Sequence, residues 1–290
     1  MRTKLILIEG LPGFGKTTTA QLVHEILTEM NIKSQLFLEG DLEHPADYEG
    51  VACFNKKEFD ELLSTYEKFS ELLRTRMIKK DNNYLLEYRK IISEDKLIFP
   101  DEFMHTVVKK DIYELSLEQN RELITKRWRE FVESALIGSD IFIFDCCFIQ
   151  NPVTIGMIKY DANKEEILSY VKELAAIVER LNPLLIYVEQ NDLEHSFRKI
   201  VKERPKEWSE GFIEYYTNQG YGQEHGYKGV EGTLHVLQAR RALEEEILNG
   251  ITIAQQKVNN SSFDLNDYKQ LLFGILSDRE QDLQINRLIF

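Results

Sequence analysis

The chain has 290 residues, 43% of them hydrophobic and 29% charged, a composition typical of a folded globular protein and not of a disordered one. Its net charge of −13 disfavours nucleic acid as a main partner, because binding a phosphate backbone needs a basic surface that releases counterions. No apolar run approaches the roughly 20 residues that cross a bilayer, and the three cysteines do not make a disulfide framework. We therefore expect a cytoplasmic protein with no membrane partner.

The first part of the chain opens with a strand signal. The run LILIE within residues 4–9 is almost wholly apolar and is ended by Gly10, which predicts a buried strand. The elements that we expect next, in chain order, are a helix at 16–30, a strand at 34–39, a loop at 42–57, a helix around 62–73 and a helix at 84–93.

The middle of the chain alternates helix and strand patterns. Ser116 and Gln119 have capping-box spacing and predict a helix that runs to about residue 137. The apolar run DIFIFD at 140–145 predicts a central strand. An amphipathic helix over 167–181 and a strand at 184–189 follow it.

The last part of the chain contains a segment without clear periodicity. Asp192 predicts the start of a helix to about residue 203, and six glycines between 205 and 232 indicate an irregular segment. We interpret about 195–232 as lid-like. The remaining expectations are a helix at 233–249, a strand at 250–258, a helix at 265–276 and an unassigned tail at 277–290.

Strands that alternate with helices favour an α/β fold, a three-layer sandwich with a five-stranded, mainly parallel sheet. The long excursion between the second and third strands, about 42–138, is interpreted as a helical insertion within one domain that covers 1–290.

The strongest motif lies directly after the first strand. Gly10, Leu11, Pro12, Gly13, Phe14, Gly15, Lys16 and Thr17 fit the pattern G-x-x-x-x-G-K-[ST]. Glycines in such a loop let successive backbone N–H groups point inward at a phosphate, and the helix that follows adds its positive end. The pattern predicts that residues 10–18, including Thr18, bind a nucleoside triphosphate. Lys16 would reach the β- and γ-phosphates, and Thr17 would ligate Mg²⁺.

This loop and the order of elements after it resemble the nucleoside and nucleotide kinase branch of the P-loop NTPase fold, with thymidylate kinases and deoxynucleoside kinases as the nearest groups. The resemblance covers about residues 1–276, although only the loop is highly specific. It implies an ATP- and Mg²⁺-dependent phosphotransferase whose partners are a nucleoside triphosphate and a small-molecule acceptor. It is also compatible with a homodimer.

The resemblance also implies roles for residues outside the loop. Asp145 ends the third predicted strand, where the family places an acidic residue near Mg²⁺ and the acceptor. Glu39 and Asp41 follow the second strand, where deoxynucleoside kinases have a glutamate that acts as base for a substrate hydroxyl. Arg198 and Arg204 follow the fourth strand, at the place of the family's lid arginines. The chain departs from the family after Asp145, where Cys146 and Cys147 stand in place of the usual arginine.

Two other classes of protein are compatible with the loop. A regulatory GTPase needs D-x-x-G after a strand and N-K-x-D to read guanine, and Asn163-Lys-Glu-Glu166 matches the second pattern only in part. A switch or assembly ATPase would use hydrolysis to act on a macromolecular partner. Dependence of ADP release on a small acceptor distinguishes a kinase from this last class. The acceptor itself, whether a nucleoside, a nucleotide or another hydroxyl compound, stays open.

Overall fold

The structure is a computed structural model that describes residues 3–262 and 264–287. The chain divides into two compact units. The first unit comprises Met1–Glu39 together with Trp128–Phe290, and the second is the continuous segment Gly40–Arg127. The expected insertion at about 42–138 therefore corresponds to a unit with its own core, whose boundaries differ by up to eleven residues from those expected.

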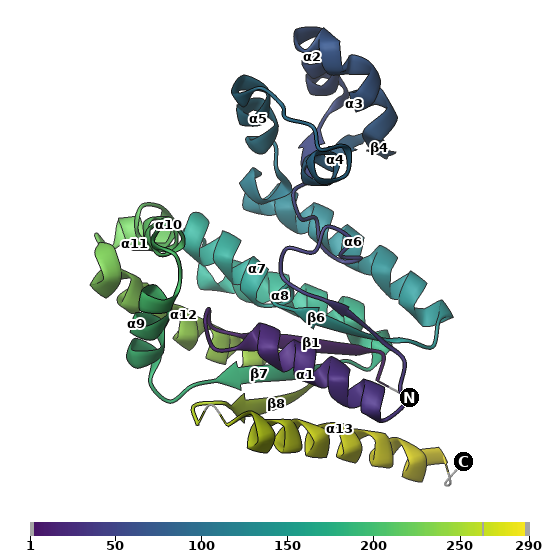
Figure 1. Ribbon diagram of the computed structural model, residues 1–290, viewed down its shortest axis with the longest axis vertical. Helices are drawn as coiled ribbons and strands as arrows, with labels where there is room; N and C mark the ends of the chain where they lie inside the picture. Colours follow the sequence, from purple (N-terminus) through teal and green to yellow (C-terminus); the bar gives the residue numbers. More distant parts are fainter. Residues whose placement is uncertain (1–2, 263, 288–290) are drawn as a thin grey trace. The chain divides into compact units, whose positions relative to one another are not determined.

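The first unit is built on a five-stranded sheet (Figure 1). Its strand order is β2-β6-β1-β7-β8, and every neighbouring pair is parallel. The strands are β1 (Leu5–Gly10), β2 (Ser34–Phe37), β6 (Ile141–Asp145), β7 (Leu184–Glu189) and β8 (Ala254–Asn259). The expected α/β fold with five strands in one sheet is thus confirmed.

Helices cover both faces of this sheet (Figure 1). α1 packs against α13 on one face, and α8 packs against α12 on the other. The helices of the first unit, including the shared α6, are α1 (Lys16–Glu29), α6 (Leu117–Ile137), α7 (Gln150–Val153), α8 (Lys164–Val178), α9 (Leu193–Glu203), α10 (Lys206–Thr217), α11 (Gly220–Glu224), α12 (Gly229–Gly250) and α13 (Leu265–Arg287). A π-helical turn, Thr154–Lys159, continues α7, and a 3₁₀ turn, Glu179–Leu181, continues α8.

The core of the first unit explains why its central strands read as continuous apolar runs. β1 and β7 lie inside the sheet with helices over both faces, so their side chains are buried in both directions. Trp128, which is fully buried, packs edge-on against Phe144 of β6 at a ring-centroid distance of 5.7 Å. Phe131 packs against the same ring at 4.8 Å. These contacts place α6, from Trp128 onward, on the sheet.

The second unit contains a three-stranded antiparallel sheet in the order β3-β5-β4. Its elements are β3 (Ala52–Phe54), α2 (Lys56–Thr65), a 3₁₀ turn (Glu67–Phe69), α3 (Ser70–Arg76), β4 (Met77–Lys80), β5 (Asn83–Leu86), α4 (Tyr88–Asp95), α5 (Asp101–Val108), a 3₁₀ turn (Ile112–Glu114) and the first part of α6. A core rich in aromatic rings holds it together, and the rings of Phe99 and Phe103 stack at 4.3 Å.

Several expectations about local structure were wrong. The loop expected at 42–57 contains β3 and the first residues of α2. The helix expected at 84–93 is split, because residues 83–86 form the central strand β5 and pair on both sides before α4 begins. The segment 205–232, expected to be irregular, forms α10, α11 and the start of α12. An added Cβ would meet backbone atoms at two of its glycines: a Cβ at Gly222 would lie 2.0 Å from Tyr216 of α10, and one at Gly232 would lie 2.7 Å from Tyr227 just before α12, so both glycines permit close packing of the chain here. The expected strand at 250–258 begins only at Ala254, where pairing with β7 begins.

Within the described residues, no helix combines the length and the apolar character that a membrane span requires.

Candidate active site

The glycine loop, residues 10–17, joins the buried strand β1 to α1. Gly13 and Gly15 have φ angles of +82° and +90°, a region that side chains rarely adopt. At Gly13 a Cβ would also lie 1.7 Å from Cδ1 of Ile200 in α9. The loop therefore needs glycine at these positions for its backbone conformation and for the close approach of α9.

Lys16 is the first residue of α1, and no side chain caps this end of the helix. Its side chain is buried, with 6% exposed, and Nζ donates a hydrogen bond to the carbonyl oxygen of Leu11 at 3.2 Å. The ammonium group thus folds back over the loop that precedes it. A buried cation beside an uncapped helix N-terminus is an environment that attracts an anion.

Thr17 and Asp145 meet at the carboxyl edge of the sheet. β1 and β6 are paired, and the Thr17 hydroxyl donates to Oδ2 of Asp145 at 2.7 Å. Asp145 is 2% exposed, and burial raises the pKa of its carboxyl, although Thr17 and Lys16 oppose that rise. Its other oxygen, Oδ1, is buried without a hydrogen-bond partner among the described residues.

This pair fits a magnesium ion. Mg²⁺ prefers oxygen ligands and uses one or two protein groups together with waters and substrate phosphates. The Thr17 hydroxyl and the Asp145 carboxylate are such groups, and the unpartnered Oδ1 offers a free acceptor. No cluster of three or more His, Cys, Asp or Glu side chains that could hold a metal occurs in the part of the chain that the structure describes. Waters or oxygens of a bound ligand would complete the coordination of such an ion.

A second buried carboxylate stands just before the loop. Glu9 accepts hydrogen bonds from the backbone N–H groups of Phe148 and Ile149 at 2.6 and 2.8 Å and of Gln150 at 3.0 Å. Burial raises its pKa to about 7, which the backbone donors oppose. Glu9 thus fixes the segment that follows Asp145, in which Cys146 has a φ of +65°.

A cavity of about 600 Å³ opens beside the glycine loop, and we call it the loop cavity. All of its lining residues belong to the first unit. They are Pro12, Gly13, Gly15, Lys16, Thr17, Thr18, Glu39, Gln150, Thr154, Ile200, Glu203, Arg204, Trp208, Phe212, Tyr215 and Tyr216. Its size lies within the range of small-molecule sites.

Some of the loop residues that were expected to bind nucleotide do not line the cavity. Gly10 and Leu11 do not line the cavity, and Leu11 contributes its backbone carbonyl to Lys16. Phe14 is buried with 2% exposed, and its carbonyl accepts a hydrogen bond from Asn260 at 2.6 Å. Gly10, Leu11 and Phe14 therefore lie on the side of the loop away from the cavity. Pro12, Gly13 and the residues from Gly15 to Thr18 line the cavity.

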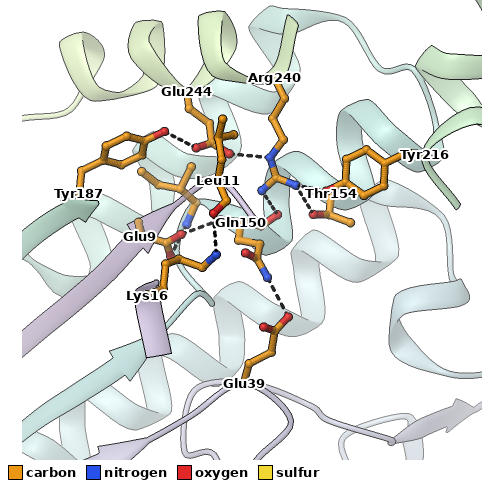
Figure 2. A network of polar contacts seen from close by, with 11 residues as sticks. Glu9, Leu11, Lys16, Glu39, Gln150, Thr154, Tyr187, Tyr216, Arg240 and Glu244 are labelled. Atoms are coloured by element: carbon orange, nitrogen blue, oxygen red, sulfur yellow. Dashed lines mark hydrogen bonds and ion pairs between the residues drawn. The ribbon is translucent and has the colours of Figure 1, made fainter. Parts of the chain in front are cut away.

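The two candidate bases lie in different units. Glu39 lines the loop cavity, and its Oε1 accepts a hydrogen bond from Nε2 of Gln150 at 2.9 Å (Figure 2). Asp41 belongs to the second unit, where its carboxylate accepts a hydrogen bond from the backbone N–H of Glu43 at 2.9 Å. Of the two candidate bases, Glu39 is therefore the one that shares a cavity with Lys16 and Thr17, and Glu203 is a second carboxylate in the same lining.

The two candidate arginines also have different surroundings. Arg204 lines the cavity, and its guanidinium lies 5.6 Å from the ring centroid of Trp208. Arg198 does not line the cavity, since it forms ion pairs with Glu194 at 2.8 Å and Glu231 at 2.5 Å. Arg204 is thus the arginine placed to meet a ligand in this structure.

Sequence reasoning missed much of the cavity wall. Gln150 and Thr154 follow Asp145 without any motif, and the aromatic lining residues Trp208, Phe212, Tyr215 and Tyr216 lie in the segment that was expected to be irregular. The buried Arg240, whose contacts reach three residues of the wall, sits in an ordinary amphipathic helix pattern. Its role depends on the fold alone.

In comparisons with known proteins, no family model matches the chain, and no curated protein matches its sequence.

Proposed function

We propose that the first unit has the P-loop NTPase fold and that the protein is an ATP- and Mg²⁺-dependent phosphotransferase that acts on a small-molecule hydroxyl acceptor. The observation that carries this proposal is that the glycine loop and Glu39 line one cavity of about 600 Å³. A phosphate-binding loop alone would suit a switch as well as a kinase. A carboxylate in the same cavity adds a group that could accept a hydroxyl proton.

The chain's own residues would act mainly by positioning and charge. Lys16 and the N-terminus of α1 would hold the triphosphate, and Thr17 and Asp145 would hold the metal. Bound Mg²⁺ would neutralise charge on the transferring phosphoryl group. Arg204, at the end of α9, would add a second positive charge to the cavity.

Glu39 would accept the proton of the acceptor hydroxyl. Gln150 holds one carboxylate oxygen through the 2.9 Å hydrogen bond, which orients the carboxylate and leaves the second oxygen for substrate. General-base catalysis by a positioned group contributes about 10²–10⁴-fold. Glu39→Gln should therefore lower kcat by about that factor with little change in KM for ATP. Asp41→Asn is the matched comparison and should leave kcat nearly unchanged.

The proposal is tested by measuring ADP release from Mg-ATP with and without a panel of nucleosides, nucleoside monophosphates and hydroxylated antibiotics. We expect a large rise with one class of acceptor, and loss of that rise in Lys16→Ala. The control is Lys33→Ala, which removes an exposed lysine paired with Asp140 at 3.4 Å. A rate that no acceptor changes would instead favour a switch or assembly ATPase, and normal turnover by Lys16→Ala would refute the proposal.

A further inference from the structure

A buried network lies behind the wall of the loop cavity (Figure 2). Its centre is Arg240 of α12, which is fully buried and pairs with Glu244 at 2.6 Å. The same guanidinium donates to the hydroxyl oxygens of Thr154 at 3.1 Å and Tyr216 at 2.7 Å, and to the carbonyl oxygen of Gln150 at 3.4 Å. Thr154, Tyr216 and Gln150 all line the cavity.

Arg240 fixes the direction of these hydrogen bonds. A guanidinium carries five N–H donors and no acceptor, so both hydroxyl oxygens must accept from it. Each hydroxyl keeps its own hydrogen, and that hydrogen must point away from Arg240. Neither Thr154 nor Tyr216 has a second hydrogen-bond partner for its hydroxyl among the residues that the structure describes. Burial raises the pKa of Tyr216, so this hydroxyl stays protonated at neutral pH.

Tyr187 provides the contrast within the same network. Its hydroxyl donates to Oε2 of Glu244 at 2.7 Å, on the other side of the ion pair. Tyr187 therefore donates its hydroxyl hydrogen to the Glu244 carboxylate. Tyr216 accepts from Arg240, so its hydroxyl hydrogen remains available to donate to another group. Whether a tyrosine hydroxyl in this network accepts or donates depends on its partner: Tyr216 meets Arg240 and accepts, and Tyr187 meets Glu244 and donates.

Gln150 supplies a second, independent observation on this wall. Its side chain is 9% exposed, and its Nε2 is used by Glu39. Because the N–H group must face the carboxylate, the amide orientation is fixed and Oε1 is the other atom. Oε1 is buried and has no hydrogen-bond partner within the described chain. An unsatisfied buried acceptor costs free energy unless a ligand or water meets it.

We propose that Arg240 makes Thr154 and Tyr216 a pair of hydrogen-bond donors that recognise an acceptor-only oxygen of a ligand in the loop cavity. Two ligands could present such an oxygen: the small-molecule acceptor, through a carbonyl or similar group, or the γ-phosphate of the nucleotide. Arg240 acts through its neighbours and is a positioning residue. The assignment of these two ligands rests on the proposed function, while the donor polarity of the wall does not.

The test measures binding, so that it does not depend on turnover. Kd is measured by calorimetry or ligand-observed NMR for Mg-ADP, for the non-hydrolysable ATP analogue Mg-AMP-PNP, and for two fragments in the presence of Mg-ADP. Acetophenone has a carbonyl that only accepts hydrogen bonds, and benzylammonium has a group that only donates them. The variants are Tyr216→Phe and Thr154→Val, with Tyr187→Phe as the control because Tyr187 does not line the cavity.

We expect Tyr216→Phe and Thr154→Val each to raise the Kd of one probe by about twofold to tenfold, the effect of one lost hydrogen bond. Weaker acetophenone binding would assign the donors to the acceptor compound. Weaker AMP-PNP binding with unchanged ADP binding would assign them to the γ-phosphate. Tyr187→Phe should change neither.

The donor wall would be refuted if both variants bound AMP-PNP and acetophenone as the wild type does, including the case in which acetophenone does not bind at all. It would also be refuted if benzylammonium bound more tightly than acetophenone and lost affinity in Tyr216→Phe. Failure of every acceptor to stimulate ADP release would remove the proposed function and leave these binding results standing. Arg240→Lys separates positioning from folding, since it should keep the charge and yet reproduce the loss seen in Tyr216→Phe.

Discussion

Replacing Glu9 by glutamine should remove a pH dependence from the stability of the first unit. Glu9 is 1% exposed and accepts three backbone hydrogen bonds from residues 148–150. Burial raises its pKa from 4.5 to about 7 despite these donors. Glutamine has nearly the same shape and does not titrate. Its amide nitrogen cannot accept from a backbone N–H group, so it loses at least one of the three hydrogen bonds. That loss does not vary with pH, so the pH dependence of the difference reports the ionisation of Glu9.

The sign follows from proton binding. Between pH 4.5 and about 7 the folded chain keeps a proton on Glu9 that the unfolded chain has lost. The folded state therefore binds more protons, and its stability falls as the pH rises through this window. One pH unit is worth about 1.36 kcal/mol for such a group. The wild type should lose about 3 kcal/mol relative to Glu9→Gln between pH 4.5 and 7, with no further change above that range.

Urea unfolding followed by tryptophan fluorescence measures this difference. Both tryptophans, Trp128 and Trp208, lie in the first unit, so the signal reports on the unit that contains Glu9. Other groups titrate alike in wild type and variant, and their contributions cancel in the difference. Glu210→Gln, at an exposed position of α10, is the matched control. A wild-type-minus-variant difference that stays constant from pH 4 to 8 would refute the reasoning.

Four further outcomes are expected. His44 should show the opposite pH dependence from Glu9. Burial lowers its pKa from 6.5 to about 4, so its contribution to the free energy of unfolding is present above pH 6.5 and is lost as the pH falls through 4. Unfolding of His44→Gln over this pH range would reveal the difference. Gly13→Ala should destabilise by about 1–3 kcal/mol, because its φ is +82° and the new Cβ meets Ile200, and Ile200→Ala should restore part of the loss in a double-mutant cycle. Asp145→Asn should weaken Mg-ATP binding far more than metal-free ATP binding in calorimetry, and equal losses would count against a metal role. Phe103→Ala should cost about 3–5 kcal/mol in the second unit, because this ring is fully buried, and a loss below about 1 kcal/mol by urea unfolding would contradict that core.

Local signals and the fold agree best where one strong physical requirement controls the residue types. β1, β6 and β7 are apolar on both faces because both faces are covered by helices, and this requirement is visible in the sequence. The glycine loop is visible for a similar reason, since its backbone angles need glycine at Gly13 and Gly15.

Elements whose stability comes from distant partners were harder to predict. The expectation of a helix at β5 was wrong because these four residues form a strand only through pairing with β3 and β4. The helices of 205–232 were hidden by glycines that permit close packing. A six-glycine segment is ambiguous in sequence, because the same residue serves loops and close helix contacts.

The sequence by itself determined the loop, its lysine and threonine, and the five strands of the parallel sheet, because each depends on residues adjacent in the chain. Only the tertiary structure decided that Glu39, Gln150 and Arg204 share the cavity with the loop, and that Arg198 pairs with carboxylates instead. It also decided the direction of the hydrogen bonds around Arg240, which joins residues up to 90 positions apart. Such contacts are set by how strands and helices pack, and no local pattern of residues encodes them.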